Sequence, residues 1–248
     1  MNPSGTGQPS TTDAVRLRHL DYAGLRLTYS GATIAIDPPM AIDVPAIVTW
    51  TEQERVAGAA RSSSALAAPP SILAWLGRSG VALAEGSPSQ LGGFVVRSRA
   101  YEPIPYATPA EAVRKTVCAL RKPWLAANRL CFASQRPPCA PLLLTLDRGG
   151  YRIAILGQAL HRFVTPESLA ALVAWVGYAD IVVAGTDYDD EVATGKMLAA
   201  FPARVRVVAD LTGAIRRKLG LPVRPLKLAG DAAPPGTRRF GPKDTLVV

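Results

Sequence analysis

The chain has 248 residues, of which 48% are hydrophobic, and its formal net charge is +9. This length and apolar content suffice for one domain with a sizeable core. No apolar run approaches the roughly 20 residues of a membrane-spanning helix, because Pro69, Pro70 and frequent arginines interrupt the candidates. We therefore expect one soluble domain without a membrane-spanning segment.

The start of the chain and its cysteines bear on its compartment. Residues 1–13 are polar and lack the basic and apolar regions that mark a signal peptide, so we expect a disordered tail before a single domain of residues 14–248. The three cysteines, Cys118, Cys131 and Cys139, are odd in number and lack C-x-x-C spacing, which argues against a disulfide framework and a zinc ribbon. These features favour a cytoplasmic protein.

The first half of the chain predicts short strands and two helices. Residues 15–37 contain two or three strand-like runs, beginning with VRLRHL and LRLTYS. Residues 46–49 form a further apolar run that stops abruptly. Helices are expected over residues 71–78 and 109–122, and the second begins with the capping box Thr108-x-x-Glu111.

The second half predicts a hairpin followed by alternating helices and strands. Residues 141–147 and 151–156 are apolar runs separated by Arg148, Gly149 and Gly150, a sequence that favours a tight turn. Thr165 and Pro166 predict the start of a helix that continues to about Trp175. The remaining expected elements are strands at 180–184, 205–209 and 223–228 and helices at 191–201 and 214–219.

Two short motifs carry a family resemblance. Asp37-Pro38 follows the early strands, and the apolar run at 46–49 leads into the sequence TWTEQER at residues 49–55. This layout resembles the metallo-β-lactamase superfamily, in which a strand ends in T-H-x-H-x-D-H, and it is most similar to the small ascorbate-phosphate-lactonase-like members. The resemblance covers residues 15–228 as an order of elements. It implies an α/β (α+β) fold, a four-layer αββα sandwich of two sheets with helices outside.

The same resemblance places the metal-binding positions of the superfamily on this chain. The histidine positions of the loop fall on Trp50, Glu52 and Arg55, and its aspartate falls on Glu54. The bridging aspartate of a later Gly-Asp-Thr turn becomes Gln158, and the final histidine becomes Asp210. The resemblance thus implies a candidate cleft with degenerate metal ligands, formed by Trp50, Glu52, Glu54, Arg55, Gln158, His161 and Asp210.

The histidine count argues against zinc in that cleft. Zinc hydrolases hold their metal with imidazoles and carboxylates, yet this chain has only His19 and His161. We interpret His19 as structural, and a lone histidine such as His161 is more often a hydrogen-bonded surface residue than a ligand. An oxygen-only site for magnesium or calcium is opposed by Arg55, because a guanidinium keeps its positive charge. We therefore expect no zinc or other cofactor and no catalytic residue.

Arg55 has two interpretations that the sequence leaves open. In the first, its guanidinium replaces the metal electrostatically and binds Glu52, Glu54 or Asp210, while Trp50 fills the remaining volume. In the second, Glu52, Glu54 and Arg55 form the exposed first turn of a helix that runs to about Ala60.

Three classes of function therefore remain. The missing ligands favour a pseudo-hydrolase that binds a small molecule or a protein through the inherited cleft. The alternative is a metal-dependent hydrolase of a small phosphorylated or lactone-like substrate, which rests on the resemblance alone. The third is a nucleic-acid-associated protein, since residues 204–248 hold ten lysines and arginines but only three acidic residues. We favour a solvated basic face as the explanation of that charge.

Overall fold

The computed structural model describes most of the chain, and four stretches that bear on the predictions lie outside its described part. Described are residues 14–21, 23–51, 53–62, 64–101, 120, 123–158, 165–186, 191–210, 234, 236–241 and 243–248. The expected tail at 1–13, almost all of the helix expected at 109–122, and the elements expected at 214–219 and 223–228 lie outside these ranges. No described helix is long and apolar enough to cross a membrane.

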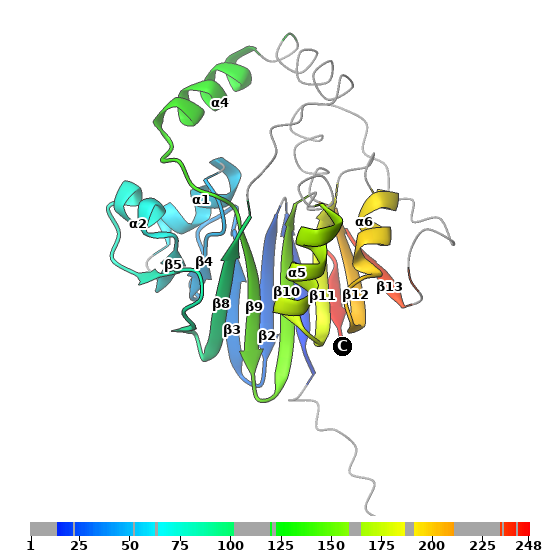
Figure 1. The fold of residues 1–248 in the computed structure, drawn as a ribbon. Helices are drawn as coiled ribbons and strands as arrows, with labels where there is room; N and C mark the ends of the chain where they lie inside the picture. Colours follow the sequence, from blue (N-terminus) through cyan, green and yellow to red (C-terminus); the bar gives the residue numbers. More distant parts are fainter. Residues whose placement is uncertain are drawn as a thin grey trace, which may run out of the picture.

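Two seven-stranded sheets form the centre of the molecule (Figure 1). The first sheet has the order β14-β1-β2-β3-β4-β5-β6, with antiparallel pairs from β14 to β3 and parallel pairs from β3 to β6. Its strands are β1 (Arg16–Asp21), β2 (Gly24–Tyr29), β3 (Ala32–Ile36), β4 (Ala46–Ile47), β5 (Leu66–Ala68), β6 (Val81–Ala82) and β14 (Thr245–Val247).

The second sheet combines a meander with a parallel half. Its order is β13-β12-β11-β10-β9-β8-β7, parallel from β13 to β10 and antiparallel from β10 to β7. Its strands are β7 (Ser89–Leu91), β8 (Phe94–Ala100), β9 (Leu142–Arg148), β10 (Tyr151–Gln158), β11 (Ala179–Thr186), β12 (Ala203–Asp210) and β13 (Thr237–Phe240). The turn between β9 and β10 uses Gly149 and Gly150, both at positive φ, which glycine adopts without strain.

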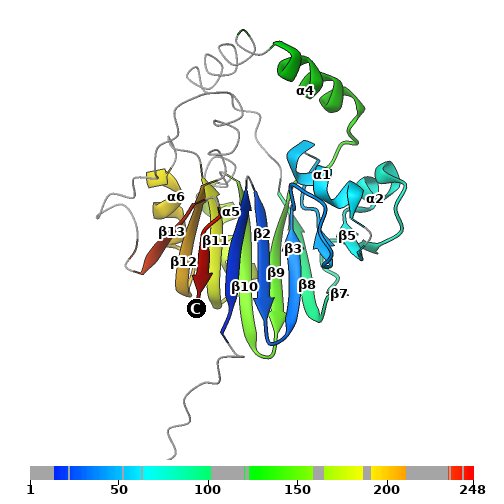
Figure 2. The same ribbon diagram turned by 180° about the vertical axis from the view of Figure 1, so that it is seen from behind.

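The described helices other than α4 lie on the outer faces of the two sheets. They are α1 (Gln53–Arg61), α2 (Pro70–Leu76), α4 (Pro123–Gln135), α5 (Pro166–Val176) and α6 (Glu191–Leu198). Helices α1 and α2 lie beside β4 and β5, whereas α5 and α6 cover the second sheet (Figures 1 and 2). Helix α5 begins as predicted, because the Thr165 side chain accepts a hydrogen bond from the Ser168 backbone N–H and Pro166 occupies the first turn.

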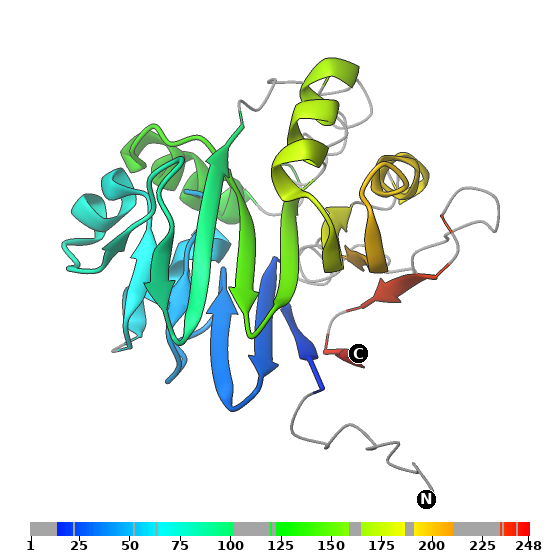
Figure 3. The ribbon, with the colours of Figure 1, turned by 60° about the horizontal axis from the view of Figure 1, so that its bottom comes forward.

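Three hydrophobic clusters define the layers. The largest lies between the sheets and is built from the inward residues of both, for example Leu27, Ile34, Leu144 and Val207. A second cluster packs the second sheet against α5 and α6, and a third packs β4 and β5 against α1 and α2. Figure 3 shows the sheets as separate layers. The expected αββα sandwich is therefore the observed fold.

The C-terminal strands join the two sheets. Strand β13 pairs with β12 in the second sheet, and a few residues later β14 pairs with β1 in the first. The backbones of Val15 and Val248 exchange two hydrogen bonds, of 3.0 and 2.9 Å. The described ends of the domain are thus adjacent.

Candidate functional site

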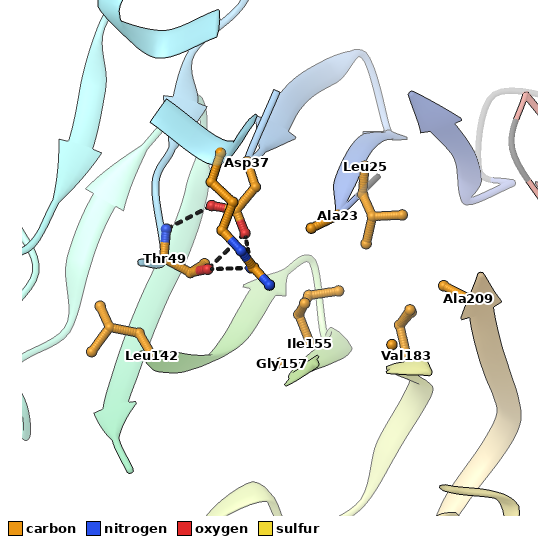
Figure 4. Close-up of a pocket in the computed structure, with 11 residues that line it drawn as sticks. Ala23, Leu25, Asp37, Thr49, Leu142, Ile155, Gly157, Val183 and Ala209 are labelled. Carbon is orange, nitrogen blue, oxygen red and sulfur yellow. Dashed lines mark hydrogen bonds and ion pairs between the residues drawn. The ribbon is translucent and has the colours of Figure 1, made fainter. Parts of the chain in front are cut away.

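One edge of the sandwich collects the ends of strands from both sheets. Parallel strands of a sheet end on the same side, so the residues that follow them lie close together. Here Asp37 follows β3, Thr49 lies two residues after β4, and Gly157 and Asp210 lie at the ends of β10 and β12. Three of these residues, together with Gly185 and Ala209, line one small cavity between the sheets (Figure 4).

Helix α1 is held against this edge by its close packing on the loop after β3. A side chain at Gly58 would collide with the backbone carbonyls of Pro38 and Met40, and the Gly58 N–H donates a 3.1 Å hydrogen bond to the Pro38 carbonyl. At the end of the helix, the Ser62 hydroxyl accepts a 3.0 Å hydrogen bond from the Ile42 N–H. This packing brings the first turn of α1 over Asp37.

Arg55, Asp37 and Thr49 form a buried charged network at the cavity wall. Arg55 Nη1 lies 2.6 Å from Asp37 Oδ2 and donates a second hydrogen bond, of 3.0 Å, to Thr49 Oγ1. Thr49 donates in turn to Asp37, from its hydroxyl to Oδ2 at 2.6 Å and from its backbone N–H to Oδ1 at 2.7 Å. The side chains of Arg55 and Asp37 are only 5% and 2% exposed. Both carboxylate oxygens are thus engaged within the network.

The electrostatics of Asp37 follow from this burial. Loss of water raises the pKa of the Asp37 carboxyl above its usual value, while the Arg55 charge and the hydrogen bonds from Thr49 oppose that rise. The aspartate has a φ of 46°, in the left-handed region that aspartate tolerates better than most residues. Its geometry therefore depends on the surrounding network.

Trp50 ties the same loop to the segment that follows α4. Its indole Nε1 donates a 3.0 Å hydrogen bond to the Cys139 carbonyl, and Arg136 donates a 3.1 Å hydrogen bond to the Thr51 carbonyl. The guanidinium groups of Arg55 and Arg136 lie 5.9 and 5.8 Å from the Trp50 ring centroid, within cation–π range. Trp50 is not one of the described residues that line the cavity.

The cavity itself is small and largely apolar. Its volume is about 30 Å³, which is room for about two water molecules. Apolar side chains such as Leu25, Ile155 and Val183 form most of its wall, and the Arg55 network forms the polar part (Figure 4). A side chain at Gly157 would begin 2.6 Å from the Tyr101 hydroxyl, so the Tyr101 side chain would have to move to admit it.

Asp210 lies beside His19 at the other end of the edge. Both side chains are buried, with 4% and 1% exposure. The His19 ring packs edge to face on Phe240 at 5.4 Å, and neither ring nitrogen makes a hydrogen bond of normal geometry. Burial lowers the pKa of His19, and the nearby carboxylates of Asp21, Asp210 and Asp244 act in the opposite direction, as does the Asp210 backbone. His19 is therefore a core residue, in agreement with its structural interpretation.

The overall arrangement matches known structures. The metallo-β-lactamase fold protein YhfI from Bacillus subtilis superposes with a TM-score of 0.57 at 7% identity, over 95% of this chain and 100% of that one. Igni18, a metallo hydrolase from Ignicoccus hospitalis, superposes with a TM-score of 0.54 at 13% identity, over 95% of this chain and 98% of that one. The fold is that of the metallo-β-lactamases. The isothiocyanate hydrolase from Delia radicum gut bacteria is also similar, with a TM-score of 0.55 and 14% identity over 93% and 98% of the two chains.

Identities this low show the metallo-β-lactamase fold and not a shared chemistry. Comparison of the sequence with protein-family models found no match, and comparison with curated proteins found none either.

The described side chains do not fit the metal that this fold often holds. Asp37 is the carboxylate of the cavity wall, and its two oxygens already accept hydrogen bonds from Arg55 and Thr49. A metal ion at this wall would lie beside the Arg55 guanidinium, which repels cations. Within the described part of the chain, no three or more histidine, cysteine or acidic side chains are grouped as a metal site would require.

The structure places only part of the predicted cleft. Trp50, Arg55 and Asp210 lie at the same edge as the backbone of Gln158. Glu52 and His161 lie outside the described residues, as do the side chains of Glu54 and Gln158. Arg55 does belong to the first turn of a helix, but the interpretation that it is exposed there is wrong, because only 4% of the residue is accessible.

Sequence reasoning missed Asp37 and Thr49 as members of the site. The signal was present, since Asp37-Pro38 and the threonine at the end of the 46–49 run were the two motifs that carried the resemblance. In the resemblance these residues mark the fold, and nothing in their sequence indicates that they pair with Arg55.

Proposed function

We propose that this protein is a pseudo-hydrolase of the metallo-β-lactamase fold, which has lost metal-dependent hydrolysis and uses its inherited cleft to bind a small molecule or a protein. The observation that carries the proposal is the 2.6 Å ion pair between Arg55 and Asp37 at the edge where this fold assembles its metal ligands. A fixed positive charge there takes the electrostatic place of a metal. It supplies neither a metal-activated water nor a vacant coordination position.

The side chains that line the cavity support binding of a small ligand group. Its apolar side chains and single charged network are typical of a pocket that orients a ligand through a few polar contacts. The volume of about 30 Å³ admits only a few atoms, so a larger ligand requires the surrounding loops to open.

Metal analysis combined with an activity screen tests this proposal. The protein is purified without chelator from zinc-supplemented medium, analysed for transition metals, and assayed on phosphorylated and lactone substrates with and without EDTA. We expect less than stoichiometric metal, no hydrolysis that EDTA removes, and no rise in melting temperature on adding zinc. One tightly bound metal per chain together with EDTA-sensitive turnover would overturn the proposal in favour of a metal-dependent hydrolase.

A further inference from the structure

The outer face of the first sheet carries a row of arginines over β1 and β2. Leu17, Leu25 and Leu27 point into the core between the sheets, so the alternating residues Arg16, Arg18 and Arg26 point outward. Arg16 and Arg18 are exposed and Arg26 is half-buried. Figure 2 shows β1, β2 and β3 with no described helix in front of them.

The arginines lie close together. Arg18 is directly opposite Arg26 in the register of β1 and β2, so their β-carbons are about 5 Å apart. Arg16 and Arg18 are two residues apart on one strand, which separates them by about 7 Å. Like charges placed directly opposite one another destabilise a sheet, and an anion between them would remove that repulsion.

The described structure provides no anion of its own for this row. Among the described residues, Arg16, Arg18 and Arg26 have no hydrogen bond or ion pair with another side chain. Asp21, the last residue of β1, is the only acidic residue of β14, β1, β2 and β3. Most arginines of the second sheet differ in this respect. Those with described partners are Arg97, Arg99, Arg148, Arg152, Arg204 and Arg206, and Arg239 also has a partner.

We infer that this arginine row, together with the threonines beside it, binds the phosphate backbone of duplex nucleic acid. Guanidinium groups match phosphate geometry, and a duplex carries one charge per about 1.7 Å of its axis, so closely spaced arginines can each contact a phosphate. Thr28, Thr33 and Thr245 lie on the same face. The Thr28 and Thr33 hydroxyls share a 3.1 Å hydrogen bond, which leaves one of these two hydroxyls and that of Thr245 to donate to phosphate oxygens.

Other polyanions fit this face less well. Binding to an anionic membrane is strengthened by exposed aromatic or aliphatic anchors, and Val247 is the one exposed large hydrophobic residue in the four strands. Single strands are held largely by stacking on aromatic side chains, and the outward positions of these strands hold none. The described part of this face has no element that could enter a groove, so binding should be independent of sequence.

Salt dependence of binding to a fluorescent DNA duplex tests the inference. The variant Arg16→Gln, Arg18→Gln, Arg26→Gln should lower the slope of log affinity against log salt by about 2.7, which is 0.9 for each phosphate that an arginine no longer neutralises. The control Arg61→Gln, Lys196→Gln, Arg238→Gln removes the same charge at exposed positions on α1, α6 and β13. It should keep the wild-type slope. Replacing the three face arginines by lysine should also keep most of the binding.

Circular dichroism and melting temperature confirm that each variant is folded, which is expected because the changed side chains face solvent. An equal decrease of the slope in the face variant and in the control would mean that only total charge matters and would overturn the inference. Absence of duplex binding by the wild type would overturn it too. Binding to phosphatidylserine vesicles that depends on the same arginines, without duplex binding, would assign the face to a membrane instead.

Discussion

Arg55 and Asp37 form an ion pair from which water is excluded, since their side chains are at most 5% exposed. Removing Arg55 leaves the buried Asp37 carboxylate without its cation, and breaking such a pair costs about 3–5 kcal/mol. Thr49 cannot replace the missing charge, because its hydroxyl already donates to Asp37 and accepts from Arg55.

The first prediction follows from this pair. Arg55→Ala should lower the free energy of unfolding by about 3 kcal/mol or more, measured by urea denaturation. Arg61→Ala, an exposed arginine at the end of the same helix, should change it by no more than about 0.5 kcal/mol. A change in Arg55→Ala as small as in this control would show that the edge is held together in some other way.

The second prediction concerns His19 and pH. Its pKa in the folded protein lies below the ordinary 6.5, so as pH falls below about 6.5 the unfolded chain takes up a proton that the folded protein resists. The contribution of His19 to the free energy of unfolding is therefore fully present above about pH 6.5. It is lost as the pH falls toward the lower pKa that His19 has in the folded protein. His19→Leu removes the titrating ring and both unpaired nitrogens.

Unfolding free energies measured between about pH 7.5 and pH 5 test this. The wild type should lose stability more steeply than His19→Leu over this range. Equal slopes would mean that His19 has a normal pKa, because every other titrating group is common to both proteins.

Asp37, one charged partner of Arg55, could not be predicted at the scale of single residues. Arg55 was expected to contact Glu52, Glu54 or Asp210, which are near in sequence or share the metal-site pattern. Asp37 is 18 residues away, and the close packing of Gly58 on the Pro38 carbonyl helps to bring the two together. The direction of a side chain depends on such close approaches, which composition and periodicity do not contain.

At the scale of elements, the loop after β4 and the segment before β9 act as one unit. Three hydrogen bonds join them, from Trp50 to Cys139, from Arg136 to Thr51, and from the Leu142 N–H to the Thr49 carbonyl. The segment leads from α4, whose Phe132 packs edge to face on Trp75 of α2. These contacts hold the loop after β4 against the segment before β9 at this edge of the sandwich.

The third prediction tests these contacts. Trp50→Phe keeps an aromatic ring but removes the hydrogen bond to Cys139, which should cost about 1 kcal/mol. Hydrogen exchange measured by mass spectrometry should accelerate in residues 136–142 and remain unchanged in β11 and β12. Trp124→Phe, at a position that is 64% exposed on α4, serves as the control and should leave exchange in residues 136–142 as in the wild type.

Most long elements could be predicted, but helix α4 and strand β8 were not, and of the strands with two or three residues only β4 was. The hairpin β9–β10, helix α5 and strands β11 and β12 fall where apolar runs and caps placed them. Strands β5, β6 and β7 have only two or three residues, too few to show a period. Their pairing comes from the sheet around them rather than from their own sequence.

At the scale of the whole molecule, the layer order was predicted through the resemblance and confirmed by the structure. Alternation of strands and helices limits a chain to a few layered arrangements, and the two motifs selected one of them. The crossing of the C-terminal segment from β13 to β14 was not predicted. It depends on Phe240 and Leu246 reaching the core from opposite sheets, and no local signal indicates which edge a terminal strand will join.

The hydrogen bonds between Val15 and Val248 hold the first and last strands of the folded domain side by side. The fold therefore does not depend on where the chain starts, and we expect a circular permutant to fold. A short linker can join Val248 directly to Val15, with new ends opened at the Gly149–Gly150 turn, whose residues are exposed. Such a permutant should keep the circular dichroism spectrum of the parent and melt in one transition, whereas new ends inside β11 should not be tolerated. The contacts that define this protein would thus survive a different order of synthesis.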